Sequence, residues 1–165
     1  MRCVMKKKTI SEAEALKRMA ACCARREYCV SDIEEKLRLL NLPAESVRHV
    51  LIRLQEEGFI DESRYCQAFV HDKLRFSGWG KRKIAQTLMQ KRIPSSVYQP
   101  VIDGLDEGEY MEVLRKVVGQ KENQLTDEDK YQRLLKVVHF AMRRGFSFDD
   151  VRKIMDTPDM DDISD

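Results

Sequence analysis

The residues of this sequence with the clearest chemical potential are cations. Between residues 64 and 94 the chain carries eight lysines and arginines against a single acid, Asp72. Three of these cations are consecutive, at residues 81–83, and they follow Trp79 closely. Clustered cations beside an aromatic side chain are typical of surfaces that bind phosphate groups or acidic proteins. This segment is therefore the first candidate for a binding site.

The place of these three cations in their helix is unusual. Ile84 and Leu88 are spaced to face inward, which predicts a helix that begins at residue 81. The helix macrodipole favours acids at such an N-terminus, not cations. We therefore expect an anion outside the helix to be their ligand, with the free N–H groups of the first turn adding contacts. The alternative is an ordinary solvated basic face without a ligand.

Other cations extend this candidate surface if their helices face the same side. Arg25 and Arg26 are expected to end one helix and Arg143 and Arg144 another, where cations also suit the helix dipole. Arg64 either pairs with nearby acids or faces a partner. The full candidate set comprises Arg25, Arg26, Arg64, Lys73, Arg75, Lys81, Arg82, Lys83, Arg143 and Arg144.

The aromatic residue of this region has two possible roles. Trp79 lies between Gly78 and Gly80, which places it in a loop. It either packs as a lid on the core of its repeat or stacks on nucleic-acid bases. A second charge feature lies further along the chain, because residues 103–112 contain five acids and no base.

No group of residues has the pattern of a catalytic or metal site. His49, His71 and His139 have no acid or cysteine at ligand spacing, and none of the five cysteines forms a C-x-x-C pair. Neither a nucleophile elbow nor a phosphate-cradling glycine loop is present. We therefore expect no enzyme, no cofactor and no metal. The cysteines at 22 and 23 are expected to be small buried hydrophobes.

The elements that must position the cations are helices, and they recur. A shift of 51 positions lays residues 33–54 over residues 84–105 without a gap. Pro43 then meets Pro94, and a fainter third copy runs over residues 137–155. A period of this size is typical of small units that bury their apolar faces by stacking.

The predicted fold class is all-α, with three tandem three-helix repeats that form an elongated, curved molecule. We expect a basic N-terminal extension over residues 1–10. The repeats are expected over residues 11–58, 59–107 and 108–156, followed by an acidic, disordered tail over residues 157–165.

Capping residues and prolines predict where these helices begin. The expected starts lie at Ser11, Ser31, Pro43, Asp61, Pro94 and Thr126. Expected breaks lie at Gly58, at residues 77–80, over a polar connection at 119–125, and at Gly145. Pro100 is tolerable only in the first turn of its helix, which then begins at residue 95 or 96.

The chain is expected to be cytoplasmic and monomeric. Its apolar runs are too short to span a bilayer, and its basic start lacks the apolar stretch of a signal peptide.

Four segments together resemble a known family. Residues 57–65 read Glu-Gly-Phe-Ile-Asp-Glu-Ser-Arg-Tyr, and Ala-Phe-Val follows at residues 68–70. Residues 80–84 read Gly-Lys-Arg-Lys-Ile, and residues 143–147 read Arg-Arg-Gly-Phe-Ser. This pattern resembles the RecX family of bacterial regulators of the RecA recombinase, over about residues 12–156.

The chain departs from the family pattern at one turn. Where the family often has glycine, this sequence has Arg92, and the equivalent residue of the first repeat is Asn41. Asparagine adopts a left-handed helix cap readily, whereas arginine is strained there. We therefore expect the turn at Arg92 to differ.

The resemblance implies a regulator that binds the RecA–DNA filament in its helical groove and inhibits ATP hydrolysis, recombination and strand exchange. It would contact single- or double-stranded DNA through the filament, or weakly alone. Two other functions stay open. One is a free-standing DNA-binding protein whose helix pairs act as helix-turn-helix elements, and the other is a helical adaptor for a different protein.

Overall fold

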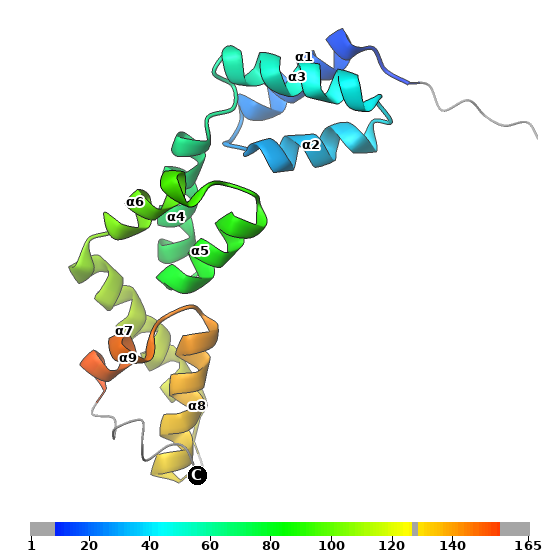
Figure 1. Cartoon of the computed structure of the whole chain (residues 1–165). Coiled ribbons are helices and arrows are strands. Elements are labelled where there is room, and N and C mark those ends of the chain that lie inside the picture. The colour runs from blue at the N-terminus through cyan, green and yellow to red at the C-terminus, as the bar shows by residue number, and fades with distance from the viewer. Residues whose placement is uncertain (1–8, 127–128, 156–165) are drawn as a thin grey trace, which may run out of the picture. The chain divides into compact units, whose positions relative to one another are not determined.

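The structure is a computed structural model that describes residues 9–126 and 129–155. These residues form nine α-helices and no strand (Figure 1). The expected N-terminal extension and acidic tail fall almost wholly outside them. In chain order the helices are α1 (Glu12–Cys23), α2 (Val30–Leu39), α3 (Ala44–Glu56), α4 (Glu62–Arg75), α5 (Lys81–Gln90), α6 (Ser95–Asp103), α7 (Glu107–Gln124), α8 (Lys130–Arg143) and α9 (Phe148–Ile154).

The predicted all-α repeat fold is confirmed. Helices α2 and α5 are both ten residues long, and their starts lie 51 positions apart. The starts of α3 and α6 also lie 51 positions apart. By contacts, the chain divides into two compact units that cut across the repeats. Unit 1 comprises Met1–Ala68 and Lys91–Ile93, and unit 2 comprises Phe69–Gln90 and Pro94–Asp165.

The repeat is most visible in the turn that follows the middle helix of each copy. Asn41, Arg92 and Gly145 stand at equivalent places, and all three have positive φ angles of 56°, 62° and 96°. The expectation that the turn at Arg92 differs is therefore wrong. Arginine takes the left-handed conformation that its repeat demands, at a cost of roughly 1–2 kcal/mol, and its guanidinium pairs with Glu34.

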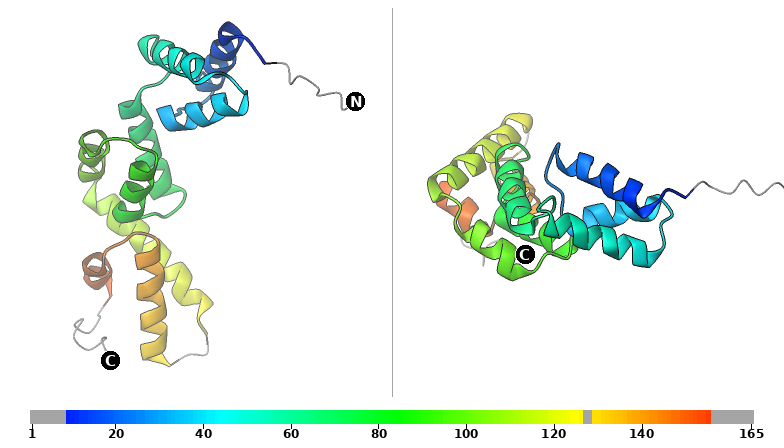
Figure 2. Two further views of the ribbon diagram at one scale, coloured as in Figure 1. Left: turned by 45° about the vertical axis from the view of Figure 1, so that its right-hand side comes forward. Right: turned by 90° about the horizontal axis from the view of Figure 1, so that it is seen from above.

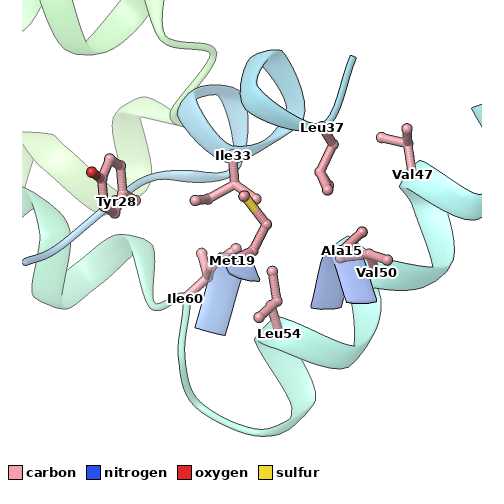
Figure 3. Close-up of a cluster of buried hydrophobic side chains, with 9 residues drawn as sticks. All are labelled: Ala15, Met19, Tyr28, Ile33, Leu37, Val47, Val50, Leu54 and Ile60. Atoms are coloured by element: carbon pink, nitrogen blue, oxygen red, sulfur yellow. The ribbon is translucent and has the colours of Figure 1, made fainter. Parts of the chain in front are cut away.

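The core of unit 1 is made by one face of each of its first three helices. Met19 comes from α1, Ile33 and Leu37 from α2, and Leu54 from α3. Figure 3 shows these side chains gathered in one cluster with Val47, Val50 and Ile60. Each fully buried aliphatic side chain contributes about 1.5–3 kcal/mol. The buried residues are spaced three to four positions apart along each helix. This spacing gives each helix one apolar face, which packs into the core.

The third repeat of unit 2 is a long helix pair closed by α9. Helices α7 and α8 lie side by side, and α9 packs on both (Figures 1 and 2). The rings of Tyr110 and Phe146, both buried, lie 5.2 Å apart between centroids. Within the described ranges, no helix is both long enough and apolar enough to cross a membrane.

Some of the expected helix starts are correct. The Ser11 hydroxyl accepts a hydrogen bond from the backbone N–H of Glu14 at 3.1 Å, and the Asp61 carboxylate accepts one from Arg64 at 3.0 Å. Ser31 does not cap α2. The helix begins at Val30, because the Asp32 carboxylate reaches back to the N–H of Cys29.

The connection between α7 and α8 is shorter than expected. Helix α7 continues through Gly119 to Gln124, so the polar connection does not begin at residue 119. A single glycine costs a helix only about 1 kcal/mol. Asp129, not Thr126, caps α8, since its carboxylate accepts from the N–H of Tyr131 at 3.2 Å.

Pro100 is not in the first turn of its helix, which corrects a further expectation. Helix α6 begins at Ser95 with Pro94 as its N-cap, so that Pro100 is the sixth residue. Without an N–H, Pro100 leaves the carbonyl of Ser96 without its helical donor. Its exposed position lets water supply that hydrogen bond.

We expect Pro100→Ala to stabilise the protein by about 1–2 kcal/mol, because it restores a helical hydrogen bond. Pro94→Ala is the control, since the N-cap needs no N–H there and the substitution only loosens the unfolded chain. It should lower stability by less than about 1 kcal/mol. Urea unfolding followed by circular dichroism measures both. A Pro100→Ala variant less stable than the wild type would contradict this account of α6.

Candidate functional site

The start of α5 is joined end to end with the end of α8. Within unit 2, the N–H of Gly80 donates to the carbonyl of Arg144 at 2.7 Å, and the N–H of Arg82 donates to that of Gly145 at 3.1 Å. The N–H of Lys81 donates to the Tyr110 hydroxyl at 3.1 Å. These N–H groups are therefore not free to bind an external anion, and that part of the sequence interpretation is wrong.

This joint depends on two glycines. A Cβ at Gly145 would lie 2.5 Å from the backbone nitrogen of Lys83, and one at Gly80 would lie 2.4 Å from the carbonyl of Gly145. Gly145 also has a φ of +96°. Only glycine lets the two backbones approach so closely. The sequence segments 80–84 and 143–147 are therefore two halves of one contact.

The loop between α4 and α5 is fixed on both sides. The N–H of Trp79 donates to the carbonyl of Lys73 at 3.0 Å, which closes the end of α4. The guanidinium of Arg144 donates to the carbonyl of Ser77 at 2.6 Å. Gly78 takes a φ of +61°, and a Cβ there would lie 2.9 Å from Val117. Trp79 consequently has a defined position.

Two lysines lie against the Trp79 ring. The ammonium nitrogen of Lys73 lies 4.7 Å from the ring centroid and that of Lys83 lies 4.4 Å from it. Phe69 meets the same indole edge to face, at 6.5 Å between centroids. The two distances from the lysine nitrogens to the ring centroid are within the range of cation–π attraction. We call Lys73, Trp79 and Lys83 the Trp79 cluster.

Three candidate cations are paired with acids instead. Arg75 forms an ion pair with Glu109, which lowers the pKa of that carboxyl, and Lys81 lies 3.5 Å from Glu107. Both acids come from the acid-rich stretch at residues 103–112. Exposed pairs of this kind contribute little to stability, but they neutralise the two cations within unit 2.

Arg64 is the third cation that the structure pairs. Its guanidinium lies 2.6 Å from the Glu27 carboxylate, donates to the carbonyl of Gly58 at 3.0 Å, and lies 3.9 Å from Asp61. It thereby links the chain before α2 with the turn that follows α3. These contacts inside unit 1 explain why the 57–65 segment contains an arginine. No external binding partner is needed to explain it.

The remaining candidates keep their charge unneutralised. Arg25, Arg82 and Arg143 have no ion pair among the described residues, while Arg26 lies 4.4 Å from the centre of the Tyr28 ring. Arg144 lies 5.1 Å from the centre of Phe140. A neutral ring or carbonyl positions a cation without cancelling its charge.

Five of the candidate cations gather around the α5–α8 joint, and we call them the basic junction. They come from α4, from the start of α5 and from the end of α8, and all belong to unit 2. The basic junction comprises Lys73, Arg82, Lys83, Arg143 and Arg144. The sequence placed them in one set, but it did not show which cations would be neutralised.

The paired arginines at 25–26 and 143–144 are not repeat equivalents. Arg25 and Arg26 follow α1, the first helix of its repeat, and lie in unit 1. Arg143 and Arg144 end α8, the second helix of its repeat, in unit 2. Their recurrence is therefore no sign of a surface repeated from copy to copy.

No candidate metal site emerges from the described part of the chain. No group of three or more histidine, cysteine or acidic residues there is placed to hold a metal ion. Burial raises the pKa of Cys66 to about 11, and it also raises the pKa of Cys29. Such thiols are poor nucleophiles at neutral pH. Cys22 and Cys23, expected to be buried, are only half-buried against the core of unit 1.

Two family models match the chain. The model of the second three-helix domain of RecX matches residues 61–99, and that of the third three-helix domain matches residues 107–155. Together they cover more than half of the sequence and include every residue of the basic junction.

Curated relatives and solved structures agree with these models. A regulatory protein RecX from Pseudomonas fluorescens is 33% identical over 141 residues, which are 84% of this chain and 88% of the relative. One from Clostridium botulinum is 28% identical over 74% of this chain, which spans only 58% of that longer relative. A crystal structure of regulatory protein RecX has a TM-score of 0.81 at 25% identity, covering 88% of this chain and 73% of that one. The crystal structure of RecX from Lactobacillus salivarius has a TM-score of 0.73 at 16% identity. The match covers 87% of this chain and 93% of the other, and it shows the same fold.

We expect Gly145→Ala to destabilise unit 2 by at least about 2 kcal/mol, because the added methyl group overlaps the backbone of α5 and the φ angle is unfavourable. Gly119→Ala is the matched control. It lies inside α7 with no atom near the new methyl group, and it should stabilise the helix by up to about 1 kcal/mol. Thermal unfolding distinguishes the two. Equal melting temperatures for Gly145→Ala and the wild type would mean that the joint does not hold α5 on α8.

Proposed function

The chain belongs to the RecX family of regulatory proteins, and we propose that it binds the filament formed by the RecA recombinase on DNA. We propose further that binding modulates the filament, mainly by inhibiting ATP hydrolysis, recombination and strand exchange. The observation that carries this proposal is the basic junction, where five cations from three helices lack a carboxylate partner among the described residues.

A nucleoprotein filament is a suitable target for such a surface. Its DNA carries one negative charge about every 1.7 Å of helix axis, and cations that displace its counterions gain affinity at low salt. Any exposed acids on the protein part of the filament would attract the same cations. The charge pattern of the chain therefore favours an anionic groove over a neutral or apolar partner.

Several weak contacts in one chain can give tight binding to a repetitive target. If Arg25 and Arg26 of unit 1 engage the filament together with the basic junction of unit 2, the second contact forms at a high effective concentration. Regulation then requires only that the bound chain obstruct or hold the RecA protomers. We accordingly propose a regulator that performs no catalysis itself.

The α5–α8 joint argues against the first alternative, a free-standing helix-turn-helix protein. A recognition helix reads base edges with its N-terminal residues in the major groove. Here the first turn of α5 is covered by the carbonyls of Arg144 and Gly145. The second alternative, an adaptor for an unrelated protein, requires an acidic surface on that protein to meet the unneutralised cations.

We expect the protein, at stoichiometric ratios, to inhibit single-stranded-DNA-dependent ATP hydrolysis by its cognate RecA. The double variant Arg82→Glu/Lys83→Glu should need at least about tenfold more protein for the same inhibition, a loss of about 1.4 kcal/mol. Arg115→Glu/Lys116→Glu reverses the same charge on the exposed surface of α7, and it should act as the wild type does.

A steady-state ATPase titration with each protein measures this, with circular dichroism to show that the variants are folded. Absence of any effect of the wild type on ATP hydrolysis would refute the proposed target. Full inhibition by Arg82→Glu/Lys83→Glu would refute the role of the basic junction.

A further inference from the structure

We propose that the Trp79 cluster is a phosphate clamp, which holds the backbone of a nucleic acid through Lys73 and Lys83 without contacting its bases. This proposal rests on the proposed function, since it specifies how the basic junction engages its polyanion. In this proposal Trp79 orients the two lysine side chains and does not stack on nucleic-acid bases.

The geometry brings two positive charges to one aromatic ring. The ammonium groups of Lys73 and Lys83 come from different helices, α4 and α5, yet both lie within 5 Å of the Trp79 ring centre. Neither forms an ion pair with an acid in the described ranges, in contrast to Lys81, which lies beside Glu107. An anion placed at the ring edge would therefore meet two available ammonium groups.

Unlike most surface lysines, these two are held in place before a ligand binds. An exposed lysine loses much of its side-chain freedom when a contact immobilises it. The indole already orients both side chains through cation–π attraction. The loop that carries the indole is itself fixed, by the hydrogen bond from Trp79 to the Lys73 carbonyl and by Gly80 against Gly145. Preorganisation of this kind raises affinity for a small anionic group.

The same contacts leave little of the indole for base stacking. A stacking platform needs an open ring face on which successive bases lie. Here the ring lies beside two ammonium groups and makes a T-shaped contact with Phe69, with an interplanar angle of 73°. The second of the two roles inferred from the sequence is thus disfavoured. A phosphate needs only the lysines, so binding should be independent of base identity.

The single tryptophan of the chain provides the measurement. The full chain is titrated with a long-chain inorganic polyphosphate, which has no bases, and with an oligothymidylate of equal charge, while Trp79 emission is recorded. Both polyanions should change the emission at similar charge concentrations, and both affinities should fall as salt rises. Lys73→Gln and Lys83→Gln should each reduce the slope of log affinity against log salt by about one.

Lys116→Gln is the matched control, because Lys116 is an exposed lysine of unit 2 that pairs with Glu112. It should leave both titrations unchanged. A labelled abasic oligonucleotide of the same length and charge should bind within about threefold of the oligothymidylate when both are measured by anisotropy. A base stacked on Trp79 would instead give the oligothymidylate a preference of about fivefold or more.

Three results would overturn the clamp: a Trp79 response to the oligothymidylate but not to polyphosphate, salt slopes unchanged in both lysine variants, or a preference of about tenfold for the oligothymidylate over the abasic oligonucleotide. Each is distinguishable from failure of the proposed function. If the protein inhibits RecA but does not respond to polyphosphate, only the phosphate clamp is refuted. If it binds polyphosphate through Lys73 and Lys83 but leaves RecA unaffected, the clamp is supported and the proposed target is refuted.

Discussion

The contact on which the rest of unit 2 depends is the meeting of two helix ends. The last carbonyls of α8 accept hydrogen bonds from the first N–H groups of α5, so the partial charges of two helix termini cancel each other. This also explains how three consecutive cations can occupy a helix N-terminus. Their conflict with the dipole of α5 is offset by the negative end of α8. The cations are therefore held at the surface by a contact that needs nothing from their side chains.

The function of a charged residue in this chain is decided by the partner that it meets. Lysines and arginines follow one another closely from residue 73 to residue 83, but Arg75 and Lys81 meet carboxylates of α7, whereas Lys73 and Lys83 meet an indole. A carboxylate cancels the charge, and an aromatic ring only orients it. The sequence gives the positions of the charges along the chain. Their neutralisation depends on contacts between segments about 26 to 34 residues apart, which no local pattern encodes.

The repeat and most helix ends could be predicted because they depend on local chemistry. Ser11 and Asp61 cap their helices through contacts three residues away, and Gly58 ends α3 through its own φ of 76°. The error at the start of α2 arose where two local signals competed. At α2, the carboxylate of Asp32 outweighs the hydroxyl of Ser31, and it is held in turn by Lys91, whose ammonium lies 2.6 Å away. That ion pair spans 59 positions, so the start of α2 is fixed partly by tertiary structure.

The three equivalent turns show how a repeated backbone feature acquires a second use. Asn41, Arg92 and Gly145 share the left-handed conformation, because each must reverse the chain after the middle helix of its repeat. At Asn41 and Arg92 the residue is exposed, so a side chain is tolerated, and Arg92 even pairs with Glu34. Gly145 is buried beneath the start of α5, where no side chain fits. The requirement for glycine in the third repeat thus comes from the joint that presents the basic junction as well as from the turn itself.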